Sequence, residues 1–260
     1  MGAYTRRRVV ASMMAAAGVS GLVRPAAGGQ DRGRQGRRRI LVFDVNETLL
    51  DVGALGPLFA RAFGDARVGQ DWFSNVVLYS QVAALAGPYA EFGAIARSAL
   101  DMTAAARGVT LAAADRDAVL RGLVTLPAHP DVRDGLDMLR QAGFRLVTLT
   151  NSAPAAVEQQ LTSAGLADYF ERSFSVDAVR TFKPAPEVYR QVAADLGVEI
   201  GSLRLIAAHA WDVMGAMQAG TAAAFIARPG KALFPLAPVP DVVGRDLREV
   251  AGRIIAIDAA

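Results

Sequence analysis

Apolar residues in this chain fall into short uninterrupted runs that alternate with longer segments of helical character. Uninterrupted apolar runs are typical of parallel strands that are buried on both faces of a sheet. The segments between the runs carry helix start and stop signals, such as Pro154 near the beginning and Gly165 just past the end of one segment. The predicted strands cover residues 40–43, 144–150, 172–177, 203–208 and 221–227. This alternation predicts an α/β protein with a Rossmann-like, doubly wound parallel sheet.

The alternation disappears between Pro57 and about Ala128. Long Ala- and Leu-rich helical patterns replace it, for example over residues 91–108. We interpret residues 57–128 as a helical cap inserted after the first strand. The α/β core then consists of residues 40–56 and 129–260.

The N-terminal segment has a different pattern from the rest of the chain. Arg6 and Arg7 precede a moderately apolar run from Val9 to Val23, and small residues follow at 26–28. This order resembles a twin-arginine export signal, so we expect residues 1–39 to be a signal and basic linker outside the fold. The mature protein would be periplasmic or otherwise exported, and it would not stay in the membrane because the apolar run is short for a span. A disordered basic leader on a cytoplasmic protein is the alternative.

The charge of the chain is uneven. The net charge is +3, but residues 1–39 hold nine arginines and one aspartate, and the remainder holds 19 basic and 24 acidic residues. That remainder has no basic cluster with interleaved aromatics, so nucleic-acid binding is not expected. The chain has no cysteine and two histidines, which excludes a Cys-ligated zinc site and disfavours a multi-histidine metal site.

Polar residues follow the predicted strands at the points where these strands end. The carboxyl ends of parallel strands meet at one edge of a sheet, where ligands collect, so we expect these residues to lie together beneath the cap. They are Asp44 after the first strand, Thr150 and Asn151 after the second, Lys183 in a later loop, and His209 and Asp212 after the 203–208 strand.

Taken in this order, these residues resemble the haloacid dehalogenase superfamily. Its signature is a nucleophilic aspartate after the first strand, a Ser or Thr after the second, a lysine after the third and an acidic residue after the fourth. The motifs FD, TL followed by D, TN, KP and WD are most similar to those of the (S)-2-haloacid dehalogenases, type II. The resemblance covers Ile40 to about Pro229. It implies a hydrolase that converts small 2-haloacids to 2-hydroxy acids through a covalent aspartyl ester and needs no cofactor.

The principal residues also suit this chemistry on their own terms. A carboxylate nucleophile at Asp44 would divide a difficult displacement into alkylation and ester hydrolysis. Lys183 would keep Asp44 ionised beside an anionic substrate. It is one of only two lysines among the 28 basic residues, which suggests that this position needs a compact charge. Asp212 would orient or deprotonate the attacking water, or it could be the N-cap of the following helix.

Other residues around the strand ends could bind the substrate. The hydroxyls of Thr48 and Thr150 would donate hydrogen bonds to Asp44 or to the substrate carboxylate, and backbone N–H groups at Val45 and Asn46 would bind the same anion. Thr48 could instead cap a helix.

The resemblance suggests roles for Asn151 and His209, and Trp211 is read from its residue type. Asn151 resembles the asparagine on the halide side of the dehalogenases. His209 stands where those enzymes commonly have asparagine, so it could help to position water, or it could be a structural histidine. Trp211 could line the pocket or belong to the core.

Most members of the superfamily are Mg²⁺-dependent phosphatases, which makes a phosphatase the main alternative. A phosphatase needs an acid two residues after the nucleophile to protonate its leaving group, and this chain has Asn46 there. Magnesium also prefers several carboxylate ligands, and the loop around Asp212 supplies only one. We therefore expect no metal.

One feature departs from the dehalogenase pattern. The family usually has an arginine after an early cap tryptophan, whereas Phe73 follows Trp72 in this chain. Asn151, Phe73 and Tyr79 could form a replacement halide site, or the substrate could differ from a simple 2-haloacid. A non-catalytic exported binding protein is a further alternative, and a two-fold homodimer is the default expectation for the assembly.

Overall fold

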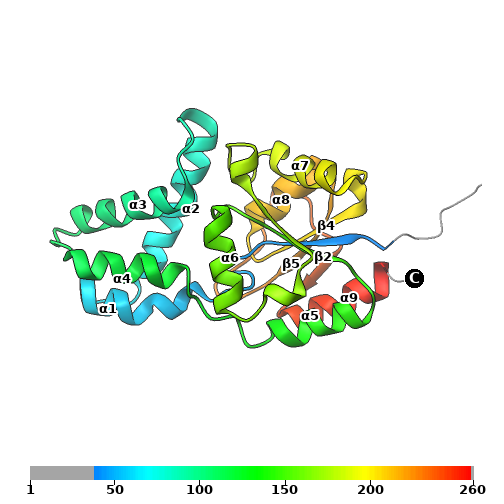
Figure 1. Ribbon diagram of the computed structural model, residues 1–260, viewed down its shortest axis with the longest axis horizontal. Helices are drawn as coiled ribbons and strands as arrows, with labels where there is room; N and C mark the ends of the chain where they lie inside the picture. The colour runs from blue at the N-terminus through cyan, green and yellow to red at the C-terminus, as the bar shows by residue number, and fades with distance from the viewer. Residues whose placement is uncertain (1–37, 259–260) are drawn as a thin grey trace, which may run out of the picture. The chain divides into compact units, whose positions relative to one another are not determined.

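The computed structural model describes residues 38–258, which contain a parallel sheet with helices on both faces and a group of helices inserted after the first strand (Figure 1). Within these residues the sheet has six strands in the order β3-β2-β1-β4-β5-β6, and each pairs with its neighbours in parallel. The strands are β1 (Ile40–Phe43), β2 (Leu146–Thr150), β3 (Arg172–Ser175), β4 (Leu203–Ala207), β5 (Ala222–Ile226) and β6 (Val242–Gly244). The predicted doubly wound α/β fold is confirmed.

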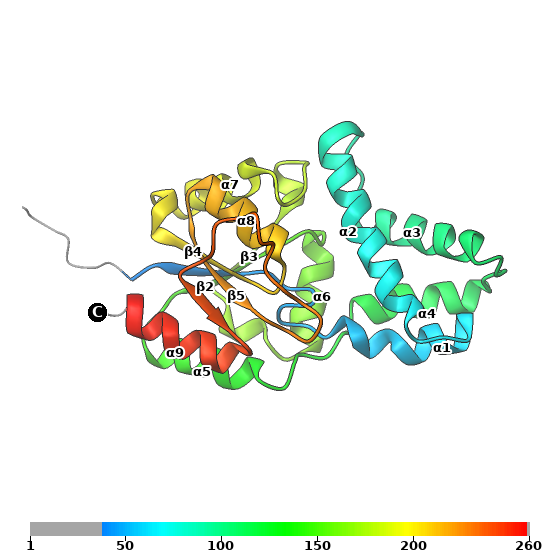
Figure 2. The same cartoon turned by 180° about the vertical axis from the view of Figure 1, so that it is seen from behind.

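The central strands are buried because helices cover both faces of the sheet. Every residue of β1, β2 and β4 is buried, as their uninterrupted apolar runs predict. On one face α5 (Val132–Gln141) and α9 (Leu247–Asp258) lie side by side, and on the other face α7 (Pro186–Leu196) lies beside α8 (Ala210–Ala219) (Figures 1 and 2). The helix α6 (Pro154–Ser163) connects β2 to β3 and begins at the predicted proline.

The sixth strand, β6, was not predicted from the sequence. It has only three residues and follows a proline-containing loop, so it presents neither an apolar run nor an alternating pattern of useful length. Short 3-10 helices occur at Val52–Leu55, Ala167–Tyr169, Val176–Ala178 and Ile200–Ser202.

The first four α-helices after β1 form a separate group beside the sheet, and α5 follows them before β2 (Figure 1). They are α1 (Gly56–Phe63), α2 (Val68–Ala86), α3 (Phe92–Ala106) and α4 (Ala113–Leu123), called the cap below. The interior of the cap is aromatic: the ring centroids of Phe59 and Trp72 are 5.2 Å apart, and those of Phe73 and Phe92 are 6.5 Å apart. Phe92 also lies 6.3 Å from Phe182, so the same aromatic cluster reaches the core loop that carries Lys183.

A second contact joins the cap to the core. Tyr89, in the loop between α2 and α3, donates a hydrogen bond from its hydroxyl to the carboxylate of Asp177, and its ring stacks on Phe182 at 5.0 Å. The cap is therefore held against the loops that follow the strands.

The register of the sheet explains why the strand ends meet. Phe43, the last residue of β1, pairs with Thr148 of β2 and with Ile206 of β4. Asp44 is the next residue, so it lies beside the ends of both neighbouring strands. The parallel topology thus gathers groups that are far apart in the sequence.

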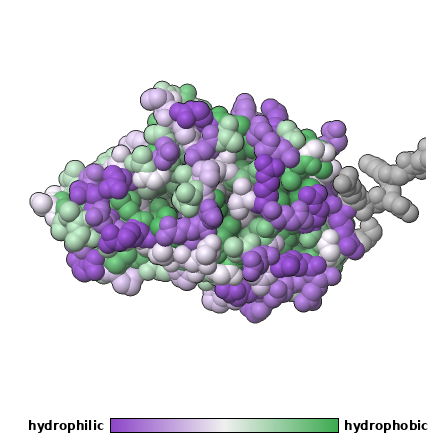
Figure 3. All heavy atoms as spheres, viewed as in Figure 1, coloured by the Kyte–Doolittle hydropathy of each residue, from purple (hydrophilic) through white to green (hydrophobic). Residues whose placement is uncertain are grey.

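No helix within residues 38–258 is both long and apolar enough to cross a membrane. On the face shown in Figure 3, hydrophilic side chains cover much of the surface over the sheet domain, and the cap surface is more mixed. The predicted export signal lies outside the described residues apart from Arg38 and Arg39.

Candidate active site

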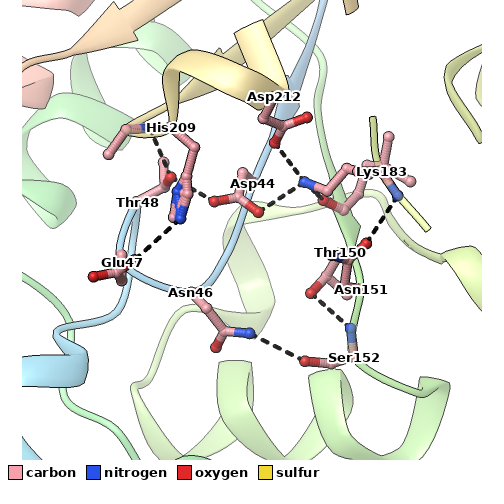
Figure 4. A network of polar contacts seen from close by, with 12 residues as sticks. Asp44, Asn46, Glu47, Thr48, Thr150, Asn151, Ser152, Lys183, His209 and Asp212 are labelled. Carbon is pink, nitrogen blue, oxygen red and sulfur yellow. Dashed lines mark hydrogen bonds and ion pairs between the residues drawn. The ribbon is translucent and has the colours of Figure 1, made fainter. Parts of the chain in front are cut away.

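A lysine ammonium held between two carboxylates forms the centre of the site (Figure 4). Nζ of Lys183 donates to Oδ1 of Asp44 at 2.7 Å and to Oδ2 of Asp212 at 2.6 Å. Its third hydrogen bond goes to the carbonyl of Leu149 at 3.0 Å, so all three N–H donors of the ammonium are used. The Lys183 and Asp212 side chains are fully buried, and that of Asp44 is 8% exposed.

Thr48 contacts the other oxygen of Asp44. Its hydroxyl donates to Oδ2 of Asp44 at 2.6 Å and accepts from the backbone N–H of Ala208 at 2.9 Å. The second bond directs the hydroxyl proton towards Asp44. The alternative that Thr48 caps a helix is wrong, because the 3-10 helix that follows is capped by Asp51.

The two aspartates have different pKa values although they share one ammonium. Burial opposes ionisation of Asp44, but Lys183, His209 and Thr48 together hold the pKa of Asp44 below its ordinary value. Burial instead raises the pKa of Asp212 to about 6, despite the opposing effect of Lys183. Burial lowers the pKa of Lys183, but the two carboxylates outweigh it and raise that pKa above its ordinary value. A carboxylate with a lowered pKa beside one that titrates nearer neutrality is an arrangement suited to a nucleophile and a base.

Tyr189 belongs to the site and was missed in the sequence. Its buried hydroxyl donates to Oδ1 of Asp212 at 2.6 Å, and burial raises the pKa of Tyr189 well above its ordinary value. The contact forms because α7 and α8 pack together, which no local pattern reveals. Asp212 itself lies in the first turn of α8, whose N-cap is His209, so the alternative that Asp212 is the N-cap is wrong.

Asn46 makes its contacts inside the protein. Its amide nitrogen donates to Oγ of Ser152 at 3.2 Å, and its carbonyl oxygen accepts from Gln160 at 2.9 Å. Gln160 also donates to the carbonyl of Leu123 at the end of α4, so Asn46 joins the nucleophile loop to α6 and the cap. The sequence did not single out Ser152 or Gln160, because each is an ordinary polar residue of a loop or helix.

The residues after β2 hold the loops in place. Oγ1 of Thr150 accepts from the backbone N–H of Ser152 at 3.1 Å, and Oδ1 of Asn151 accepts from the backbone N–H of Lys183 at 3.2 Å. Val45 is fully buried, and its carbonyl accepts from two backbone N–H groups of its own turn. The structure thus brings these predicted residues to the site.

His209 lies beside Asp44, on the side away from Lys183 (Figure 4). Its Nε2 is 3.2 Å from Oε2 of Glu47, and Oε1 of Glu47 accepts from Lys231 at 2.8 Å. The ring of Trp211 packs edge-on against the His209 ring at 5.0 Å and is only partly buried. Neither Glu47 nor Lys231 was singled out from the sequence, since an isolated charged residue in a loop usually faces solvent.

A hollow of about 420 Å³ opens where the cap meets the segment after β1 that carries Glu47. Its lining includes Glu47, Phe73, Arg67, Arg228 and Lys231. Tyr79 is not among the lining residues, and it is 43% exposed on α2. The structure therefore does not bring Asn151, Phe73 and Tyr79 together as a halide site, because the aromatic cluster of the cap turns Phe73 inward and leaves Tyr79 at the surface.

A model of the haloacid dehalogenase-like hydrolase family matches residues 39–220, which is more than half of the 260-residue chain. The chain belongs to this family. The resemblance inferred from its motifs is confirmed.

Named relatives and a solved structure agree with this assignment. An (S)-2-haloacid dehalogenase of Xanthobacter autotrophicus is 32% identical over 192 residues, which cover 73% of this chain and 75% of the relative. One from Pseudomonas sp. (strain YL) is 29% identical over 212 residues, covering 81% and 91%. The structure of the L-2-haloacid dehalogenase from Xanthobacter autotrophicus, with chloropropionic acid covalently bound, is similar with a TM-score of 0.79 and 27% identity, over 85% of this chain and 99% of that one.

The donor set of this haloacid dehalogenase-like hydrolase does not suit a divalent cation. Among residues 38–258 no three His, Asp or Glu side chains are grouped so that they could hold a metal ion. Asp44 and Asp212 both accept hydrogen bonds from the ammonium of Lys183, and the nearby Asn46 uses its amide oxygen to accept from Gln160. A hard cation that needs several oxygen ligands would have to displace these contacts.

Proposed function

We propose that this hydrolase removes halide from small 2-haloacids and yields 2-hydroxy acids. The observation that carries the proposal is Asp44, a carboxylate held ionised by Lys183 and oriented by Thr48, with an amide instead of an acid two residues later. A departing halide needs no proton, so this site has what a dehalogenation requires. The names of the relatives and the covalently bound chloropropionic acid in a similar structure support the same reaction.

In the first step an oxygen of Asp44 attacks the substrate carbon that carries the halogen. A carbon–oxygen bond forms as the carbon–halogen bond breaks, the halogen leaves with the bonding electrons, and the configuration at the carbon inverts. Lys183 keeps Asp44 in the ionised form that can attack, and its charge favours the approach of a substrate carboxylate.

In the second step water attacks the carbonyl carbon of the Asp44 ester. Asp212 accepts a proton from this water, because its pKa of about 6 leaves it ionised at neutral pH whereas Asp44 is esterified in this step. The tetrahedral intermediate expels the 2-alkoxide, which is protonated to the 2-hydroxy acid. Asp44 returns to its ionised form, and the full reaction releases one halide ion and one proton.

The phosphatase alternative is not favoured. A phosphoryl ester needs an acid for its alkoxide leaving group, and the position two residues after Asp44 holds Asn46, whose amide is bound to Ser152 and Gln160.

A substrate panel tests the proposal. We expect purified protein to release halide from 2-chloro and 2-bromo acids at a rate that EDTA does not change, because a departing halide needs neither an acid nor a metal ion to leave. Halide release and inorganic phosphate are measured for 2-haloacids and for small phosphate esters, each with and without EDTA. Phosphate release that EDTA abolishes and Mg²⁺ restores, with no halide release, would reverse the assignment.

The same assay across pH reports on the base. Asp212 must be ionised to accept a proton, so we expect halide turnover to fall as the pH decreases through about 6. The pKa of Asp44 lies below its ordinary value and that of Lys183 above its ordinary value. Neither group should therefore change the turnover rate further near neutral pH.

We also propose that the protein is exported through its N-terminal segment. The order of Arg6, Arg7, an apolar run and small residues supports this assignment. A reporter fused to residues 1–39 is expected to leave the cytoplasm, and changing both arginines to lysine is expected to retain it there. Equal export of the two fusions would contradict the proposal.

A further inference from the structure

His209 is a buried histidine with one ring nitrogen bound and one unbound. Its side chain is 5% exposed, and Nε2 lies 3.2 Å from Oε2 of Glu47. Nδ1 is buried and has no hydrogen-bond partner among residues 38–258. Buried polar atoms are normally paired, so an unpaired nitrogen in a histidine whose ring lies near Asp44 calls for a functional explanation.

Glu47 is held in an unusual backbone conformation. Its φ angle is +60°, in the left-handed region that residues other than glycine rarely adopt. Such strain persists where the surrounding structure requires it, and it is often found at functional sites. Here the conformation directs the Glu47 carboxylate towards His209, and Lys231 binds the other carboxylate oxygen at 2.8 Å.

The surroundings decide which ring nitrogen carries the proton. Burial lowers the pKa of His209 to about 4, with Asp44 opposing this shift and Lys231 and Lys183 adding to it, so the ring is neutral at pH 7. Burial raises the pKa of Glu47, and Lys231 limits that rise. An ionised Glu47 has only acceptor oxygens, so the nitrogen facing it, Nε2, must be the protonated one. Nδ1 is then left with an unshared electron pair.

That electron pair selects what can lie beside it. A halide or a substrate carboxylate carries no proton to donate and is repelled by the pair. In the reaction proposed above, the groups that can donate are the hydrolytic water and the hydroxyl of the product.

We propose that Glu47 is a positioning residue that holds His209 in the tautomer protonated at Nε2, so that Nδ1 accepts a hydrogen bond from the water that hydrolyses the Asp44 ester. This inference rests on the proposed dehalogenation. His209 orients the water by accepting this bond, and the proton transfer itself goes to Asp212. Glu47 thus acts on the second chemical step through His209 and has no part in the first.

The tautomer can be observed without a substrate. The chain has only two histidines, so ¹⁵N NMR of the imidazole nitrogens gives few signals, and the set that disappears in His209→Asn belongs to His209. We expect the wild type to show His209 protonated at Nε2 and Glu47→Gln to show a mixture of the two tautomers, since a glutamine amide can both donate and accept. Glu158→Gln, the same substitution at an exposed position on α6, is the control and should match the wild type.

The kinetic test separates the two chemical steps. In rapid-quench experiments with a 2-haloacid, Glu47→Gln is expected to give a halide burst at the wild-type rate. Hydrolysis of the ester should be about tenfold slower, the effect of one weakened hydrogen bond in the transition state. The alkylated Asp44 peptide should then accumulate and be visible by mass spectrometry. Glu158→Gln should leave both steps unchanged.

The outcomes distinguish this inference from the function on which it rests. A wild-type halide burst, together with equal slowing of both steps in Glu47→Gln or with an unchanged His209 tautomer, would overturn the inference alone. The absence of halide release from the wild type with every 2-haloacid would overturn the proposed function.

A second variant covers the case in which Glu47→Gln does not fold. Lys231→Met keeps Glu47 but removes the cation that lowers its pKa, so Glu47 should become protonated at a higher pH. Ester hydrolysis should then begin to fall at a higher pH than in the wild type, while the halide burst keeps its pH dependence. An unchanged pH profile for ester hydrolysis would contradict the inference.

Discussion

Asp44→Asn is expected to abolish halide release while the protein stays folded. The amide has almost the shape of the carboxylate, but it is neutral and a poor nucleophile, so the first step loses its attacking group. The fold should tolerate the change, because Lys183 still binds Asp212 and Thr48 can still donate to the side-chain oxygen. Halide release and the thermal unfolding midpoint are the measurements. The mass of the peptide that contains position 44 checks that deamidation has not regenerated the aspartate in the variant.

An isotope experiment on the wild type tests the covalent step itself. After a single turnover in ¹⁸O water, the Asp44 peptide should carry the label and the 2-hydroxy acid should be largely unlabelled. The product oxygen comes from Asp44 in this mechanism, and the oxygen of water replaces it in the enzyme. Label in the product with none in Asp44 would show that water is the first nucleophile, which would refute the covalent mechanism.

Lys183→Met is expected to have the second large effect, on stability as well as on activity. Removing the ammonium leaves Asp44 and Asp212 buried without their shared counter-ion, and breaking a buried ion pair from one side costs about 3–5 kcal/mol of folding free energy. Turnover should fall by at least about a thousandfold. Without the ammonium the pKa values of both Asp44 and Asp212 rise, so less of each residue is ionised and able to act as nucleophile or base. Urea unfolding and halide release are measured on the same preparation.

Two companion variants isolate the electrostatic cause. Arg190→Met, which removes a cation at an exposed position of α7, should change neither quantity. The double variant Lys183→Met with Asp212→Asn should recover part of the lost stability, because it removes one of the two unpaired charges. If Lys183→Met were as stable and active as Arg190→Met, the ammonium would not be the central charge of the site.

Much of the molecule follows from the sequence because its signals are local. The uninterrupted apolar run before Asp44 predicts a buried parallel strand, and parallel topology then gathers Asp44, Thr150, Lys183 and Asp212 at one edge without any knowledge of side-chain packing. The absence of an acid at Asn46 likewise needed only the spacing from the nucleophile. The strand β6 was missed because three residues are too few to form a pattern.

The tertiary structure decided what each side chain touches. Asn46 and Gln160 are 114 residues apart and meet only because α6 packs against the nucleophile loop, and Tyr189 reaches Asp212 only because α7 lies beside α8. The sequence by itself determined the parallel α/β fold and predicted which polar residues follow its strands, since these depend on apolar periodicity and on residue type. Long-range packing determined the partner of His209 and the exposure of Tyr79, since a loop conformation and the rotation of a helix about its axis are set by the whole core.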